Sequence, residues 1–477
     1  MAYTYDAIRS FDGVRMDLSD YLLPKGASND ACNMDTRNGA LKTCKGFSRA
    51  VPALLPTGSQ PKRMYVYTTA SGKRYLALTA NKLYRYNETT QAWTALYTFS
   101  QSIRAEAVDF LPIRIGSDNR LLIAYGNGQM LTYDAPTNQI ERFGSTEMLS
   151  DRHVCFAELY FGRLFAAGDA SCPCRLYWSK APGGSRSIDD WRQDPDSENV
   201  SGGFVDVGVD DDPITGLFAL SNQLLIFKRD TLYRLLGDRP ANYRVLPVDA
   251  AFLQPQHTGC VRYADRLYFL TESGLCCYDG QTVRRPGNFR ALEPFLREEA
   301  SLADVRAAAC GDTLYFAVHT PEVAAGNDVV IEYDVLRDRY MLRRGFLTAD
   351  LFSTHGSLYA LLDTGKTVLF DDSDDYDGDP ILAWWWTPRI DFGHKETTKK
   401  LLSLMADGTG RIRVVAMSNG GVHQSEVTFA QTTDAVTEIP LQTVGRVFRL
   451  CFTNVDAEPM TMEAGCTLLY DVQRRPV

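Results

Sequence analysis

The residues of this chain that could do chemistry are scattered, and none stands at the spacing that a familiar catalytic centre requires. The six histidines fall in neither an HExxH nor an HxH pattern, so we interpret them as structural. They are His153, His257, His319, His355, His394 and His423. The chain also contains no GxSxG nucleophile elbow and no P-loop. We therefore expect a protein that is not an enzyme.

Two acidic clusters and two close cysteine pairs are the possible metal sites. If the cluster Asp371–Asp379 is aligned with a 12-residue EF-hand loop, the loop begins at Ser373. Its twelfth position is then Trp384, where an EF-hand has Glu. The other cluster, Asp210–Asp212, has no such spacing, and we interpret both as solvated turns. Neither cysteine pair has a second pair or a histidine at zinc-finger spacing. The pairs are Cys172 with Cys174 and Cys276 with Cys277. We expect no metal and no cofactor.

The elements that hold these residues repeat along the chain. An apolar strand, a short polar turn, a second strand and a Tyr-rich strand recur at intervals of about 40–45 residues, close to one propeller blade. The first copy runs from Arg63 to Phe99 and the seventh from Gly356 to Phe370. Apolar and polar residues alternate with period two, as half-buried strands require. The main exception is 289–300, where we predict a helix.

This pattern predicts an all-β fold with a six- or seven-bladed β-propeller, seven being favoured. A pair of sandwiches or a solenoid would also contain many short strands, but a solenoid repeats at about 20–30 residues. A propeller ring is often closed by a strand from the opposite terminus. We expect residues 40–52 to supply that strand and to pair with the blade formed by 347–372.

Three regions are expected: an N-terminal arm over 1–57 that includes the closing strand, the propeller over 58–375, and a C-terminal β-sandwich over 376–477. The acidic stretch 371–379 is interpreted as a linker. Trp384, Trp385 and Trp386 follow it, and at least one of them should face away from the sandwich core because side chains alternate along a strand. Further strands are predicted near 387–392, 400–405, 411–417, 424–429, 436–441, 445–453 and 464–471.

The amino-acid composition and net charge of the chain limit the kinds of partner that it can bind. Hydrophobic residues make up 45% of the 477 residues, enough for a large core, and the net charge of −9 supplies no general basic face for duplex DNA. No segment approaches the ~18 apolar residues of a membrane helix, so no membrane association is expected. The first residues lack a secretory signal, and we interpret the 11 cysteines as reduced thiols of a protein made in the cytosol.

Several short segments along the chain share a likeness to one known family. They are Phe11–Val14, Leu23–Ala27, Asp30–Asp35, Gly39–Leu41, Gly46–Phe47, Phe161–Gly168, Arg175–Ser179, Ile214–Leu217, Asn222–Lys228, Leu232–Gly237, Asp391–Gly393, Lys399–Leu401 and Arg446–Asn454. Together they resemble the β-propeller virion proteins of tailed bacteriophages, of the tail hub or nozzle type that stabilises packaged DNA, and the likeness spans nearly the whole chain. The resemblance implies a ring in the virion tail or neck, below the portal, that helps to retain and conduct DNA. It offers no catalytic residues.

The implied partners are further copies of the chain in a ring, expected to be hexameric, portal or adaptor proteins, and tail fibres or spikes. DNA is expected to lie near the lumen of the ring without specific contacts. For the assembly interface we select Trp384, Trp385, Trp386, Phe11, Arg474 and Arg475. Two other functions stay open: a host-receptor or glycan-binding propeller at the tail tip, and a glycan-cleaving propeller, which the missing Asp boxes disfavour.

Overall fold

The computed structural model describes residues 4–70, 72–104, 106, 108–144, 148–183, 187–194, 197–248, 255–429 and 436–472. It is an all-β structure, in which strands form nearly all of the regular elements. Its one described α-helix, α1 (Glu293–Glu298), is shorter than the predicted 289–300, because Pro294 lies in its first turn and suits only a helix start. No described helix is long and apolar enough to span a membrane.

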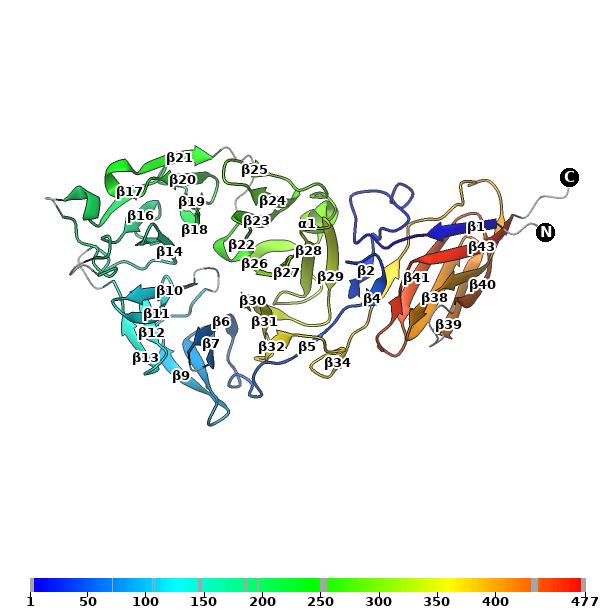
Figure 1. Cartoon of the computed structure of the whole chain (residues 1–477), viewed down its shortest axis with the longest axis horizontal. Coiled ribbons are helices and arrows are strands. Elements are labelled where there is room, and N and C mark those ends of the chain that lie inside the picture. Colours follow the sequence, from blue (N-terminus) through cyan, green and yellow to red (C-terminus); the bar gives the residue numbers. More distant parts are fainter. Residues whose placement is uncertain are drawn as a thin grey trace.

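Consecutive four-stranded antiparallel sheets occupy residues 61 to 343, and residues 348 to 370 begin a larger sheet that follows them (Figure 1). The first strand of each sheet lies on the inside and the fourth on the outside, as in the blades of a β-propeller. The first two sheets are β6 (Pro61–Thr69), β7 (Gly72–Thr79), β8 (Lys82–Asn87) and β9 (Ala92–Thr98), then β10 (Asp109–Ile115), β11 (Asp118–Ala124), β12 (Leu131–Asp134) and β13 (Gln139–Arg142).

The next sheets continue round the ring in chain order. They are β14 (Phe156–Tyr160), β15 (Arg163–Ala167), β16 (Arg175–Trp178) and β17 (Gly203–Asp206); β18 (Ile214–Leu220), β19 (Gln223–Lys228), β20 (Leu232–Leu236) and β21 (Arg244–Val248); β22 (Cys260–Tyr263), β23 (Arg266–Thr271), β24 (Gly274–Tyr278) and β25 (Val283–Arg284); and β26 (Ser301–Cys310), β27 (Thr313–His319), β28 (Val329–Asp334) and β29 (Arg339–Arg343). The second strands of the sheets, such as β15, β19 and β27, are the most deeply buried and consist mostly of apolar residues, which explains why the repeat is visible in the sequence.

The last sheet of the ring is completed from the N-terminal region. β30 (Thr348–Thr354), β31 (Ser357–Leu362) and β32 (Thr367–Phe370) are joined by β5 (Phe47–Arg49), which pairs antiparallel with β32. β5 lies inside the segment 40–52 for which the sequence predicts this pairing. The first and last sheets of the ring are then adjacent through β6 and β30.

The acidic stretch 371–379 is not the free linker predicted from its composition. It forms β33 (Asp375–Tyr376) and β34 (Asp379–Pro380), which extend the sheet beyond β5. The Asp377 carboxylate lies 2.8 Å from both the Arg49 guanidinium and the Lys366 ammonium. Gly46 permits the close approach, since a Cβ there would lie 1.7 Å from the Asp375 carbonyl oxygen. Asp377 is therefore paired with two cations, and the segment forms part of the last sheet of the ring.

Beyond the ring, two further sheets contain most of the C-terminal residues. One has the order β1 (Thr4–Ile8), β43 (Cys466–Val472), β36 (Lys399–Ala406) and β40 (Thr437–Gly445). The other has the order β2 (Ala31–Cys32), β35 (Trp384–Trp386), β41 (Phe448–Asn454), β38 (Arg411–Ser418) and β39 (Gly421–Thr428). The strand predicted at 387–392 is wrong: only an isolated bridge from Ile390 to Phe448 forms there, and Pro388 has no N–H to offer a ladder.

The N-terminal region does not stand apart, because it supplies strands to sheets throughout the molecule. β1 and β2 are edge strands of the two C-terminal sheets, and β5 belongs to the ring. Between them, β3 (Met34–Asp35) and β4 (Leu41–Thr43) join β42 (Thr461–Met462) and β37 (Gly408–Thr409) in a small sheet. One hydrophobic core runs through all three regions; it includes Phe11, Tyr268 and Leu314 together with Leu404 and Phe452.

Candidate functional site at the propeller axis

Charged side chains of the inner strands meet near the axis of the ring, and the Asp350 carboxylate on β30 contacts the others. Its carboxylate lies 3.0 Å from the guanidinium of Arg63 on β6 and accepts the Met64 N–H at 2.8 Å. It also lies 3.9 Å from the guanidinium of Arg306 on β26. Side chains of Asp350 and Arg306 are 2% and 1% exposed. This carboxylate therefore links three neighbouring sheets, including the first and the last.

A second group of side chains links the first strands of other sheets. His257, in the short turn before β22, places Nε2 3.3 Å from the Asp109 carboxylate on β10. The imidazole stacks on Phe218 of β18 at 4.5 Å between ring centroids and lies 5.3 Å from Phe156 of β14. Asp109 also accepts the Ala157 N–H at 3.1 Å. His257 thus links the turn before β22 to the first strands of the three preceding sheets, β10, β14 and β18.

Burial and charge act in opposite directions on the two carboxylates of this group. Burial alone would raise the pKa of Asp109, but His257, the Ala157 N–H and Arg63 hold that pKa below its usual value. At Glu158 of β14, burial dominates and raises the pKa, although the guanidinium of Arg262 lies 3.2 Å away. The difference arises because Arg262 is 48% exposed, so water weakens its attraction.

The raised pKa of Glu158 predicts that its charge destabilises the fold at neutral pH. An acid whose pKa is higher in the folded state than in the unfolded state contributes a penalty that grows as pH rises through the folded pKa. We expect Glu158→Gln to raise the free energy of unfolding by about 1 kcal/mol at pH 8, because Gln keeps the shape without the buried charge. The gain should shrink as the pH falls toward 4.5, the usual pKa of a Glu side chain.

Thermal unfolding of the wild-type and Glu158→Gln proteins between pH 5 and pH 8 measures this effect. The matched control is Glu141→Gln, which removes an acid that is 57% exposed beside Arg120. The control should change the melting temperature little at any pH. A Glu158→Gln protein that is less stable than wild type at pH 8 would mean that its ion pair with Arg262 outweighs the cost of burial.

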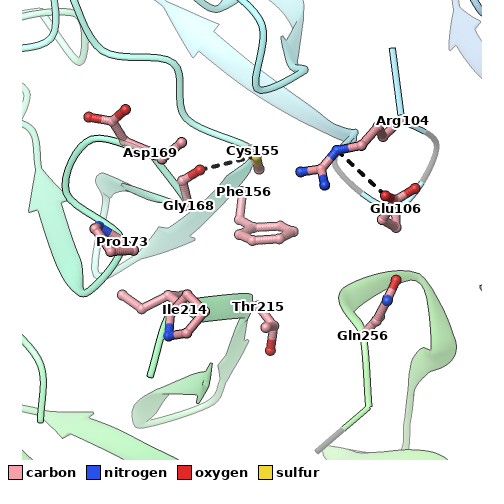
Figure 2. A pocket seen from close by; sticks show the side chains of 12 residues that line it. Arg104, Glu106, Cys155, Phe156, Gly168, Asp169, Pro173, Ile214, Thr215 and Gln256 are labelled. Atoms are coloured by element: carbon pink, nitrogen blue, oxygen red, sulfur yellow. Dashed lines mark hydrogen bonds and ion pairs between the residues drawn. The ribbon is translucent and has the colours of Figure 1, made fainter. Parts of the chain in front are cut away.

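A pocket of about 350 Å³ opens beside this group, among β14, β18 and the loop that precedes β10 (Figure 2). Phe156 lies at its middle, with Ile214 and Thr215 on one side and Gln256 on another. Arg104 and Glu106 face each other across 3.6 Å at its rim. The third charged lining residue, Asp169, lies 3.4 Å from the Arg152 guanidinium, so the charges of the lining are paired and favour neither an anion nor a cation.

The three consecutive tryptophans point in alternate directions, as predicted for a strand. Trp385 is fully buried and meets Phe11 edge-to-face at 5.6 Å. Trp384 and Trp386 are partly exposed; Trp384 Nε1 donates to Asp30 at 2.8 Å, and Trp386 lies 5.0 Å beneath the Arg449 guanidinium. Trp385 and Phe11 therefore belong to the core, and their side chains offer no surface to a partner, contrary to their selection for the assembly interface.

The other residues selected from the sequence lie apart from the axis. Arg474 and Arg475 lie outside the described residues. Asp212 caps a turn by accepting the Asp230 N–H at 2.9 Å, so this acidic cluster has a structural use. All 11 cysteines are free thiols, and no group of three or more metal-ligating side chains occurs among the described residues.

Sequence reasoning missed Asp350, Arg63, Arg306 and Asp109 altogether. Each lies on the first strand of a sheet, but these strands also carry other polar side chains, such as Lys62, Arg114 and Asp304, so no local pattern distinguishes the four. Their partners are up to 287 residues away, so the sequence does not say which opposite charge each one meets.

No known family model matches the chain, and no curated protein matches it. Among solved structures, the computationally designed protein Ika8 is similar with a TM-score of 0.41 and 10% identity, over 68% of this chain and 99% of that one. BamB from Moraxella catarrhalis is similar with a TM-score of 0.38 and 11% identity, over 77% of this chain and 97% of that one.

Proposed function

We propose that the chain is a structural protein of a tailed-bacteriophage virion, which forms a ring in the tail or neck below the portal. In this proposal the ring of sheets is a seven-bladed propeller, and the two C-terminal sheets form a β-sandwich. The ring of subunits retains and conducts DNA and attaches other tail parts, including fibres or spikes. The chain performs no catalysis in this role.

The observation that supports this proposal most is the way in which the N-terminal region joins the two large parts. Residues 4–49 contribute strands to both C-terminal sheets, to the small sheet between them and to the last sheet of the ring. A single hydrophobic core is shared by all of them. Because one segment supplies strands to all of these sheets, the ring and the C-terminal sheets resist bending relative to one another. Such rigidity suits a subunit of a closed ring.

Immunogold labelling of particles from the source culture tests the proposal directly. Label at the junction between capsid and tail is expected. Label at the distal tip would instead favour the second candidate, a host-receptor or glycan-binding propeller, and particles without label would contradict a place in the virion. Light scattering of the purified chain is the accompanying measurement, with a hexamer as the expected assembly.

A further inference from the structure

A groove in the C-terminal region concentrates positive charge on a protein whose net charge is −9. It has a volume of about 600 Å³, within the range of ligand pockets. Four of its lining residues are cations: Arg389, Lys395, Arg446 and Arg449. No carboxylate is among the lining residues that the structure describes. We call this cavity the basic groove.

Few carboxylates neutralise these four cations. Arg389 lies 3.4 Å from the Asp20 carboxylate, the one ion pair found among the described residues around the groove. Arg449 donates to the Thr387 carbonyl at 3.2 Å and to the Asn29 amide oxygen at 2.7 Å, both of them neutral acceptors. Lys395 and Arg446 are exposed. Their positive charge is therefore available to an anion.

Aromatic and apolar surface completes the groove. Tyr21 is 47% exposed, and the Lys395 ammonium and the Arg389 guanidinium lie 4.6 Å and 5.3 Å from the centre of its ring. Met417 adds a thioether that is 42% exposed. Trp386 lies below Arg449 and holds that guanidinium at the groove wall. A flat, partly exposed ring beside several cations suits a ligand that presents both an apolar face and negative charge.

We infer that the basic groove binds an acidic polysaccharide, a sugar chain whose units carry carboxylate or phosphate groups. Arginine matches such groups with paired N–H donors, and the C–H face of a sugar ring packs on an aromatic side chain. A nucleic acid is the weaker fit, since it demands cations along a track that neutralises successive phosphates. Here the cations surround a single cavity. The inference concerns this site alone and holds with or without the ring proposed above.

The test uses the full chain and three defined probes in isothermal titration calorimetry. Tetragalacturonate supplies four carboxylates on a sugar chain, maltotetraose is its uncharged counterpart, and five-residue oligothymidylate supplies four phosphodiesters. We expect tetragalacturonate to bind with a dissociation constant below about 1 mM, and the affinity to fall as salt is added. Maltotetraose should not bind measurably.

Substitutions of the lining residues test whether tetragalacturonate binds in the basic groove. Lys395→Ala with Arg446→Ala should weaken tetragalacturonate binding at least tenfold, whereas Arg229→Ala with Arg284→Ala removes the same charge from exposed positions on the propeller and should not. Tyr21→Ala should also weaken binding, and Tyr21→Phe should retain it. Unchanged melting temperatures would show that the variants are folded.

Three results would overturn the inference. They are no tetragalacturonate binding up to about 1 mM, an equal loss in the two double variants, or equal binding of maltotetraose. Tighter binding of oligothymidylate that depends on Lys395 and Arg446 would assign the groove to single-stranded nucleic acid instead. A phosphorylated glycan that competes with tetragalacturonate would show that phosphate groups also satisfy the site.

Discussion

Replacing Asp350 by Asn is expected to lower the free energy of unfolding by about 3–5 kcal/mol, because it leaves two arginines near the axis without their shared counter-charge. Arg306 is 1% exposed and Arg63 is 16% exposed, so water cannot take the place of the carboxylate at Arg306. Burial already lowers the pKa of Arg306, which shows how poorly its surroundings solvate the charge. The Met64 N–H can still donate to the Asn side-chain oxygen. The loss of unfolding free energy therefore comes mainly from the missing negative charge.

Urea unfolding followed by circular dichroism measures this effect. The matched control is Asp304→Asn, which removes the other carboxylate paired with Arg306 but one that is 56% exposed. This control should cost less than about 1 kcal/mol, as partly exposed ion pairs do. An Asp350→Asn protein within 1 kcal/mol of wild type would show that the ring does not depend on this contact between its first and last sheets.

Replacing Trp385 by Ala is the second change with a large expected effect, about 3–5 kcal/mol of unfolding free energy. Its indole is fully buried in the shared core and packs against Phe11, whose ring also meets Phe452 at 6.0 Å. Truncation would leave a cavity where the N-terminal region crosses the C-terminal sheets. Because the backbone of Trp385 pairs with Ala31, the cavity should also loosen that crossing.

Two controls separate packing from other causes. Trp384→Ala removes a neighbouring, partly exposed indole with a hydrogen bond to Asp30, and should cost about 1 kcal/mol. Trp385→Phe keeps an aromatic ring, and it removes an indole N–H that has no hydrogen-bond partner among the described residues, so it should cost less than Trp385→Ala. Equal losses for Trp384→Ala and Trp385→Ala would contradict a core role for Trp385.

The sequence by itself determined the all-β class and the repeat, because both depend on local alternation of apolar and polar residues. Strands such as β38 and β40 alternate between buried and exposed side chains, whereas β23 and β31 are short apolar runs that end at turns with Gly or Asp. Their positions followed from residues close together in the chain, where side-chain direction is fixed by the backbone. The strand wrongly expected at 387–392 was misjudged because Pro388 removes a ladder donor.

Only the tertiary structure decided which distant residues meet. The contact of Asp350 with Arg63 and that of His257 with Asp109 depend on how the sheets close into a ring, and no local pattern encodes that closure. The basic groove likewise combines Tyr21 with residues 389–449, which are brought together when the N-terminal region crosses the C-terminal sheets. Burial of Phe11 and Trp385 has the same origin: an apolar side chain is equally suited to a core or to an interface, and only the packing of the folded chain distinguishes them.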